Sequence, residues 1–125
     1  QKAFILQTDA SNFGIGACLF QDHDGRKHPV MHASRKLLDR EKNYSVGERE
    51  ALAIKWGVEK FHRFLYGRHF TLESDHRPLQ YLNSSDSQSP RLMRWSLALQ
   101  PYRYTVKYIR GEDNFCADYL SRCVD

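Results

Sequence analysis

The sequence predicts an α/β (α+β) fold in which helices flank a five-stranded mixed sheet. Apolar runs and turn signals over residues 3–35 predict a three-stranded meander. Helical and strand patterns then alternate to the end of the chain, and such an order requires crossovers, which are right-handed. The 125 residues are 41% hydrophobic and contain no internal repeat, as expected of one domain. We expect this single domain, residues 1–125, to be excised from a longer polypeptide, because it begins almost directly with a strand.

The meander consists of three predicted strands. The run AFILQTD (3–9) is apolar and ends in Asp, as expected of a buried strand. The run FGIGACLFQ (13–21) combines apolar and small residues and leads into an Asp-Gly turn. HPVMHASR (28–35) returns as the next antiparallel strand, and a polar connection follows it.

The rest of the chain alternates between helices and strands. We predict, in order, a helix over 46–66, a strand over 67–75, a short helix or turn over 76–82, a loop over 83–90, a helix over 91–100, a strand over 102–109 and a helix over 115–122. The helix over 91–100 places Leu92, Trp95 and Leu99 on one apolar stripe. In the strand over 102–109, Tyr and Val alternate with Arg, Thr and Lys, which is typical of a half-exposed strand.

Composition limits the class of partner and the compartment. A net charge of +4 favours an anionic partner, although many unrelated proteins are equally basic. No apolar run approaches the roughly 20 residues of a membrane span, so we expect no membrane partner. The three cysteines, Cys18, Cys116 and Cys123, are odd in number and lack the spacing of metal sites. We predict free thiols in a reducing compartment, with Cys18 in a buried strand.

Two glutamates near the start of the long helix have different predicted roles. Ser45 is a good N-cap and Glu48 follows three residues later, so the pair predicts a capping box. Steps of three and four from Glu50 reach Ile54 and Val58, on the apolar stripe that should face the sheet. A carboxylate on that stripe is costly unless it is paired, binds a metal or reaches a solvated cleft.

Three aspartates are predicted to lie at the same edge of the sheet as Glu50. Asp9 ends the first strand and Asp75 ends the fourth. If these strands are parallel neighbours, both side chains leave the sheet at its carboxyl edge, where ligands bind in open α/β sheets. Asp118 lies in the last helix, near the same face if Phe115 anchors that helix to the core.

Four converging carboxylates would repel one another unless they bind cations or have raised pKa values. All-oxygen ligation suits Mg²⁺ or Mn²⁺ better than Zn²⁺. Each acid also has a simpler interpretation: Asp9 can begin an Asx turn, Asp75 can cap the next segment, Glu50 can pair with a lysine and Asp118 can be a surface residue. Only their joint placement favours a metal site.

The motifs TDAS, SDHRPL, RWSLALQPY and ADYLSR occur in this order. Together with the segments around them, they resemble the ribonuclease H domain of reverse transcriptases from gypsy-type long-terminal-repeat retrotransposons, over residues 3–122. The resemblance implies a ribonuclease H-like fold within a Pol polyprotein. It implies an endonuclease that cleaves the RNA strand of RNA–DNA hybrids during reverse transcription.

By resemblance, the four catalytic acids of the family match Asp9, Glu50, Asp75 and Asp118. These acids would hold two Mg²⁺ ions about 4 Å apart, for which Mn²⁺ can substitute. Asp9 would contact both ions, Glu50 and Asp75 one ion, and Asp118 the other. The family pattern also selects Glu50 over Glu48 as the catalytic glutamate.

Contacts to nucleic acid are expected around these acids. The candidates are Ser11, Asn12, Gly47, Arg49, His76, Arg77, Arg91 and Arg94. Arg91 and Arg94 would lie together on the outer face of their helix, although solvated arginines are the simpler interpretation. Many relatives carry a histidine in the loop before the last aspartate, whereas YIRGEDNFCAD has none. Arg110 could replace it, but a surface arginine is again the simpler interpretation.

The resemblance also suggests partners and a location. We expect an RNA–DNA hybrid, an upstream polymerase or connection domain, and a dimer in the full enzyme, in a cytoplasmic retroelement particle or the nucleus. A domesticated copy that only binds nucleic acid or serves as a scaffold is an alternative. An integrase of related fold is a third, which the DHRPL and ADYLSR contexts disfavour.

Overall fold

A five-stranded mixed sheet forms the centre of the protein, as the sequence predicts. The computed structural model describes residues 3–75 and 90–123. The strands are β1 (Phe4–Ala10), β2 (Gly14–His23), β3 (Arg26–Lys36), β4 (His69–Ser74) and β5 (Arg103–Tyr108). Their order in the sheet is β3-β2-β1-β4-β5. β1, β2 and β3 form the predicted antiparallel meander, and β4 and β5 run parallel to β1.

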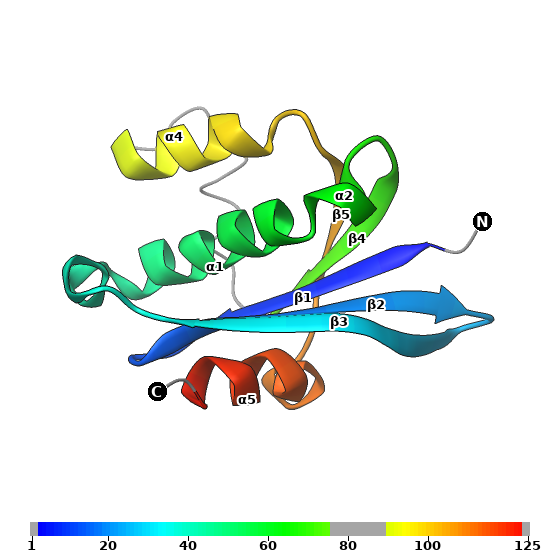
Figure 1. Cartoon of the computed structure of the whole chain (residues 1–125), viewed down its shortest axis with the longest axis horizontal. Helices are drawn as coiled ribbons and strands as arrows, with labels where there is room; N and C mark the ends of the chain where they lie inside the picture. Colours follow the sequence, from blue (N-terminus) through cyan, green and yellow to red (C-terminus); the bar gives the residue numbers. More distant parts are fainter. Residues whose placement is uncertain (1–2, 76–89, 124–125) are drawn as a thin grey trace.

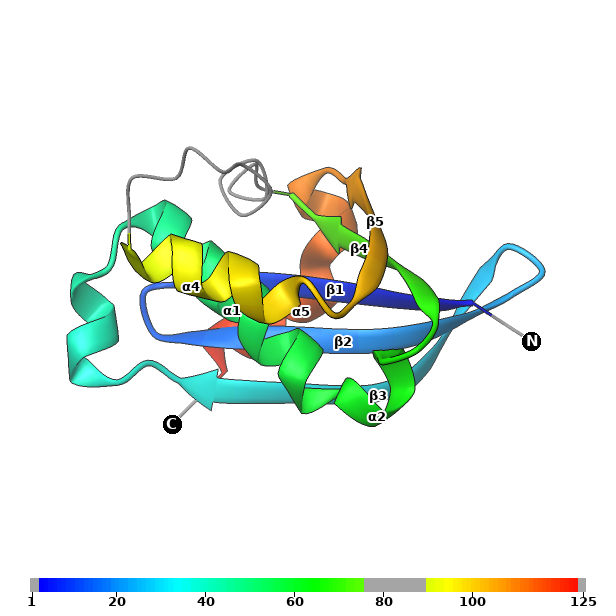
Figure 2. The same cartoon turned by 90° about the horizontal axis from the view of Figure 1, so that it is seen from above.

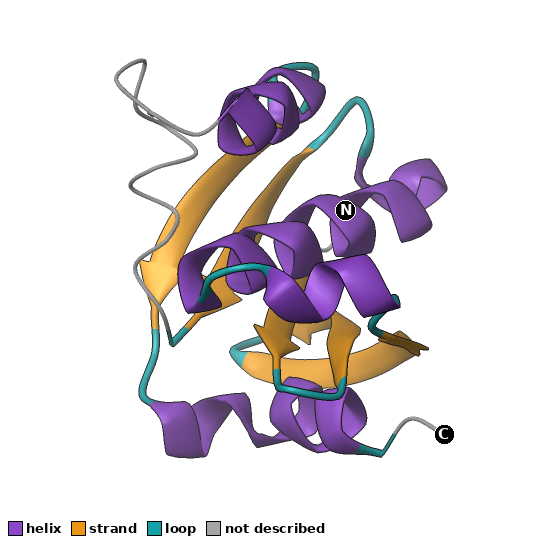
Figure 3. Cartoon of the chain, turned by 90° about the vertical axis from the view of Figure 1, so that its left-hand side faces the viewer, coloured by secondary structure: helices purple, strands orange, loops and turns teal. Residues whose placement is uncertain are grey.

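Helices cover both faces of the sheet (Figures 1 and 3). The two main helices on one face are α1 (Val46–Lys60) and α4 (Pro90–Leu99), which lie side by side (Figure 2). The helix α5 (Phe115–Arg122) packs on the other face, mainly against β2 and β1. Short 3-10 turns, η1 (Asp39–Asn43) and η2 (Gly111–Asn114), precede α1 and α5. Among the described residues, no helix has the length and apolar character needed to cross a membrane.

The long predicted helix over 46–66 is interrupted at Phe61. The backbone of this buried residue leaves helical geometry, with φ −105° and ψ 27°, and a short helix α2 (His62–Leu65) follows. The apolar stripe continues through the interruption, since Phe61 and Leu65 are both buried. The periodicity therefore predicted the buried face correctly but could not reveal the change of direction.

The buried face of α1 includes the charge that the sequence placed there. Ile54 and Val58 have no exposed surface, and Glu50 is only 3% exposed. On α4, Trp95 and Leu99 are buried and Leu92 is half-buried, so the predicted stripe faces inward. The helix α1 thus presents Glu50 to the sheet at the edge where β1 ends.

α5 lies very close to β2, and a glycine permits this approach. A Cβ atom on Gly16 would overlap the carbonyl oxygen of Ala117 and lie 2.8 Å from the Cβ of Leu120. Ser11 strengthens the attachment, because its hydroxyl donates a 2.7 Å hydrogen bond to the carbonyl of Ser121. Any larger residue at position 16 would push α5, and with it Asp118, away from the sheet.

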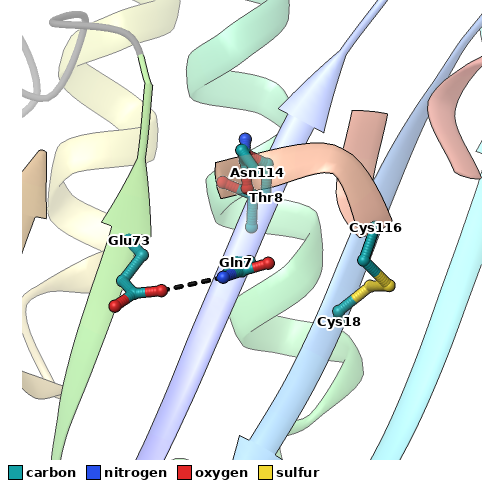
Figure 4. The surroundings of a disulfide bond; sticks show 6 residues. All are labelled: Gln7, Thr8, Cys18, Glu73, Asn114 and Cys116. Atoms are coloured by element: carbon teal, nitrogen blue, oxygen red, sulfur yellow. Dashed lines mark hydrogen bonds between the residues drawn. A yellow bond between two sulfur atoms is a disulfide. The ribbon is translucent and has the colours of Figure 1, made fainter. Parts of the chain in front are cut away.

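The prediction of three free thiols is wrong. Cys18 of β2 and Cys116 of α5 form a disulfide across 98 residues of sequence, with their Cα atoms 6.8 Å apart (Figure 4). Cys18 is buried in its strand, as predicted, and Cys123 is the exposed free thiol. The pairing depends on how α5 sits on β2, which cysteine spacing alone does not reveal.

Candidate active site

The topology brings the four predicted acids to one edge of the sheet. Asp9 lies near the end of β1, and Asp75 directly follows β4. Because these strands are parallel neighbours, in register from Phe4 and Phe70 onward, both chains arrive at the same edge. Glu50 reaches this edge from α1 on one face, and Asp118 from α5 on the other. The parallel pairing on which the sequence prediction depended is therefore confirmed.

Asp9 and Glu50 form a buried carboxyl pair. Asp9 is 4% exposed and Glu50 is 3% exposed, and their side chains share a hydrogen bond. Asp9 also hydrogen-bonds the side chain of Asp118, and the backbone N–H of Ala10 interacts with both members of the pair. Asp9 therefore links Glu50 on α1 with Asp118 on α5.

Burial and mutual repulsion raise the pKa values of this pair. Burial, the charge of Asp75 and the hydrogen bond with Asp118 raise the pKa of Asp9 from 3.8 to about 7. Burial, with added repulsion from Asp9 and Asp75, raises the pKa of Glu50 from 4.5 to about 9. A neighbouring divalent cation would reverse this balance by favouring the charged forms.

The other two acids are less enclosed. Asp118 is half-buried and accepts a 3.0 Å hydrogen bond from the Nε atom of Arg122. Asp75 acts on Asp9 and Glu50 through its charge, and its Oδ1 atom lies 3.4 Å from the Nδ2 atom of Asn114. Within the described part of the chain, no three His, Cys, Asp or Glu side chains stand close enough together to enclose a metal ion.

The residues nevertheless fit a hard divalent cation chemically. The donors are all carboxylate oxygens, which Mg²⁺ and Mn²⁺ prefer. Burial, with added repulsion from neighbouring carboxylates, raises the pKa values of Asp9 and Glu50, and acids perturbed in this way are typical of functional sites. The assignment of these four acids as metal ligands remains a prediction.

A small hollow of about 230 Å³ adjoins Glu50. Its lining residues come from the β1–β2 connection, the first turn of α1 and the end of α5: Ala10, Ser11, Asn12, Val46, Arg49, Glu50 and Arg122. Of the predicted nucleic-acid contacts, Asn12 is exposed and Arg49 is half-buried beside this hollow. The hydroxyl of Ser11 is engaged with α5, so Ser11 has a clear structural role.

The remaining predicted contacts have different outcomes. Gly47 is half-buried in the first turn of α1. Arg91 and Arg94 do not share the outer face of α4, which corrects the sequence prediction. Arg91 instead pairs with Glu48 at 2.8 Å and stacks over a tyrosine ring, whereas Arg94 is exposed. The positions His76 and Arg77, the predicted segment over 76–82 and all of the predicted loop over 83–90 except Pro90 lie outside the described residues, as does the Phe115 side chain.

Glu48 closes the capping box that the sequence predicts at the start of α1. The hydroxyl of Ser45 accepts a 3.1 Å hydrogen bond from the N–H of Glu48, and the Glu48 carboxylate accepts one from the N–H of Ser45.

Arg110 is an exposed arginine that pairs with Glu112 at 2.9 Å and with Asp113 at 3.1 Å. The surface interpretation of Arg110 is therefore correct.

One residue at the site was not predicted from the sequence. Asn114, at the junction of η2 and α5, has no exposed surface and contacts both β1 and Asp75. An asparagine before a helix usually indicates a cap, but this side chain makes no cap hydrogen bond. Only the three-dimensional arrangement connects it with the acids.

Comparison with known proteins identifies the family. A family model described as the RNase H-like domain found in reverse transcriptase matches residues 1–102. The chain is 46% identical over 121 residues to the retrovirus-related Pol polyprotein from transposon 412 of Drosophila melanogaster, covering 97% of this chain. It is 42% identical over 123 residues to that from transposon gypsy of the same organism, covering 98% of this chain. It spans only 10% and 12% of these two polyproteins.

Solved structures share the fold at low sequence identity. An N-terminal RNase H domain from Mycobacterium tuberculosis matches with a TM-score of 0.73 at 14% identity, covering 94% of this chain and 95% of that chain. LC11-RNase H1 in complex with RNA/DNA hybrid matches with a TM-score of 0.68 at 14% identity, covering 94% and 92%. The foamy viral protease-reverse transcriptase in complex with RNA/DNA hybrid gives 0.66 at 16% identity, covering 89% and 16%. The chain therefore belongs to the RNase H-like domains found in reverse transcriptases, and its relatives are retrovirus-related Pol polyproteins of gypsy-type transposons.

Proposed function

We propose that this domain is a metal-dependent endonuclease that hydrolyses the RNA strand of RNA–DNA hybrids. The observation that carries the proposal is the buried Asp9–Glu50 pair, whose pKa values are raised first by burial and then by the neighbouring carboxylates at the same edge. Two proteins of the same fold have structures in complex with RNA/DNA hybrid, which supports this class of substrate. Family membership supports a role in reverse transcription.

The four acids would hold two Mg²⁺ ions, or Mn²⁺ in their place. Their ligands would be the carboxylates of Asp9, Glu50, Asp75 and Asp118. The ions would supply positive charge to the attacked phosphate and lower the pKa of the attacking water. The acids must be deprotonated to act as ligands, so Asp9 and Glu50 would release their protons on metal binding.

The chain's own residues would orient the substrate. Asn12 and Arg49 line the hollow next to Glu50, where a donor amide and a cation can bind phosphate oxygens. Arg122 fixes the carboxylate of Asp118 through their 3.0 Å hydrogen bond. The water oxygen would form the new bond to phosphorus and release one proton to solvent, while the bond from phosphorus to the 3′ oxygen breaks and that oxygen takes up one proton from solvent. The products are a 5′ phosphate and a 3′ hydroxyl.

The parts of the polyprotein outside this domain would contribute to binding. The relatives are roughly ten times longer than this chain, so an upstream polymerase or connection domain would supply further hybrid contacts. Assembly of the full enzyme as a dimer, and a location in a cytoplasmic retroelement particle or the nucleus, stay predictions.

The test is cleavage of an end-labelled RNA–DNA hybrid with Mg²⁺ or Mn²⁺. Wild-type protein should cut the RNA strand internally, and Asp75→Asn should not. Asp39→Asn, a change at an exposed acid of η1, is the matched control and should cut at the wild-type rate. Hybrid binding by the wild type without cleavage in either metal would contradict the proposal and favour a binding module.

A further inference from the structure

Asn114 occupies a gap between the two strands that carry Asp9 and Asp75. The residue pairing between β1 and β4 ends at Gln7 and Glu73, two residues before these acids. Beyond that point, the Nδ2 atom of Asn114 donates a 3.0 Å hydrogen bond to the carbonyl of Thr8 and lies 3.4 Å from the Oδ1 atom of Asp75. The second contact is long for a hydrogen bond. Figure 4 shows Asn114 directly beside Thr8 of β1.

The same turn also approaches the other oxygen of Asp75. A Cβ atom on Gly111, at the start of η2, would lie 3.3 Å from the Oδ2 atom of Asp75. The two ends of η2 therefore approach the two oxygens of one carboxylate. Because Asp75 follows the last residue of β4, the position of its side chain depends on this turn as well as on its strand.

Asn114 is fully buried, but only part of its side-chain amide is hydrogen-bonded among the described residues. Its side chain has no exposed surface, and its Oδ1 atom has no hydrogen-bond partner among the described residues. A buried acceptor without a donor destabilises the folded state. Within the described residues, the Asn114 amide is therefore engaged through its donor end, which faces Thr8 and Asp75.

We propose that Asn114 is a positioning residue that fixes Asp75 relative to Asp9 and thereby sets the affinity of the acid cluster for divalent cations. The inference rests on the proposed function, because it assumes that the acids bind metal. Asn114 acts through Asp75 and the backbone of β1. Loss of its amide would leave Asp75 free to turn away from Asp9, so more metal would be needed to bring the acids together.

Gln7 provides a matched control with the same chemistry. Its buried amide donates a 2.8 Å hydrogen bond to the carboxylate of Glu73, two residues before Asp75, as Figure 4 shows. Glu73 is neutralised by Lys27 at 2.7 Å and is not one of the four acids. Gln7→Ala thus removes a buried amide that bridges the same two strands without touching the acid cluster.

The experiment follows the rise of Tm with Mg²⁺ concentration, without nucleic acid, and fits it to obtain the Mg²⁺ midpoint, defined as the dissociation constant at which half of the folded molecules bind the ion. Asn114→Ala should raise this midpoint by about 10- to 100-fold, the range for residues that orient metal ligands. Gln7→Ala should lower Tm and leave the midpoint unchanged. Equal midpoints in wild type and Asn114→Ala would overturn the inference alone. No stabilisation of the wild type by Mg²⁺ would overturn the proposed function and the inference with it.

If Asn114→Ala does not fold, an NMR titration of the wild-type protein tests the positioning role of Asn114. In ¹⁵N-labelled wild type, the side-chain amide signals of Asn114 should shift during the Mg²⁺ titration with the same midpoint as the increase in Tm. The side-chain signals of Gln7 should stay in place. An Asn114 signal that does not respond to saturating Mg²⁺ would overturn the positioning role.

Discussion

Two pairs of buried acids in this domain lie in opposite electrostatic surroundings. Glu41 and Glu73 each meet a basic side chain, whereas Asp9 and Glu50 meet other carboxyl groups. All four are at most 4% exposed, so burial alone does not separate them. The difference lies in the charge that the fold provides beside each one.

Glu41 shows how the fold satisfies a buried acid for structural purposes. Arg35 binds both of its oxygens, at 2.8 and 3.0 Å, and the N–H of Leu38 donates a further 2.7 Å hydrogen bond. Burial acts to raise the pKa of Glu41, but these donors outweigh it and hold the pKa below its ordinary value. The charge and the hydrogen-bonding capacity of Glu41 are therefore satisfied by the protein itself, without an outside ligand.

Asp9 and Glu50 lie in the opposite surroundings, with other carboxyl groups beside them. Burial and like charge raise both pKa values, so the folded protein without metal is poorer at holding the charged forms than water is. Concentrating this cost at one edge of the sheet is destabilising, and under the proposed function a bound cation would offset it. Glu41 and Glu73 are thus satisfied within the fold, whereas Asp9 and Glu50 are the acids to which we assign the proposed function.

The largest expected effect is on cleavage. Glu50→Gln should lower the rate of hybrid cleavage by more than about 100-fold at saturating Mg²⁺, because residues that merely orient metal ligands already account for 10- to 100-fold. Glu41→Gln should leave the rate unchanged. Initial rates with a labelled hybrid test both variants, and a similar loss in the two would remove the functional distinction.

The same two substitutions should change stability in opposite directions. In EDTA at pH 8, Glu50→Gln should raise the free energy of unfolding by about 1 kcal/mol or more, since a tenfold change in proton affinity corresponds to about 1.4 kcal/mol. Glu41→Gln should lower it by about 1–3 kcal/mol, because Arg35 loses a charged partner. Urea unfolding followed by circular dichroism measures both. Destabilisation by Glu50→Gln would show that its charge is already compensated.

The raised pKa values also predict how stability depends on pH. The folded state binds protons more tightly than the unfolded state at Asp9 and Glu50. Their contribution to stability is therefore fully present below about pH 4 and is lost as pH rises through about 7 and about 9.

Thermal melting of metal-free protein should accordingly show a decrease in Tm between pH 5 and pH 9. Mg²⁺ should reverse most of this decrease at the upper end and have little effect at the lower end. Glu50→Gln should flatten the metal-free profile. An increase in Tm with pH over this interval would contradict the raised pKa values of Asp9 and Glu50.

The smallest effect is expected at Glu48, two residues from Glu50. Glu48→Gln should cost about 0.5–1 kcal/mol, because it weakens the capping box and the ion pair with Arg91. The Mg²⁺ midpoint in thermal melting should stay at the wild-type value. A shift as large as that of Glu50→Gln would mean that the two glutamates are not functionally distinct.

Local patterns in the sequence were sufficient for much of the fold and for the placement of the four acids at one edge of the sheet. The stripe through Glu50 and Ile54 depends on helical periodicity, and the capping box at Ser45 depends on a spacing of three residues. The shared edge of Asp9 and Asp75 follows once β1 and β4 are taken as parallel neighbours. Each of these inferences needs only one segment or one assumption about topology.

Features that depend on contacts between distant segments could not be predicted in this way. The disulfide joins residues 98 positions apart, and the amide of Gln7 meets Glu73 across 66 positions. Asn114 contacts Thr8 across 106 positions. In each case the residues are visible in the sequence. The position in which α5, η2 or β4 packs against its neighbouring strand is not.

The Cys18–Cys116 disulfide makes most of the domain a covalent ring. Glu50 and Asp75 lie inside that ring, and Asp9 and Asp118 lie just outside it, on its two short tails. A single proteolytic cut anywhere between residues 18 and 116 would open the ring without releasing a fragment. In a family whose members are parts of polyproteins, a nicked oxidised domain would still keep all four acids on one molecule.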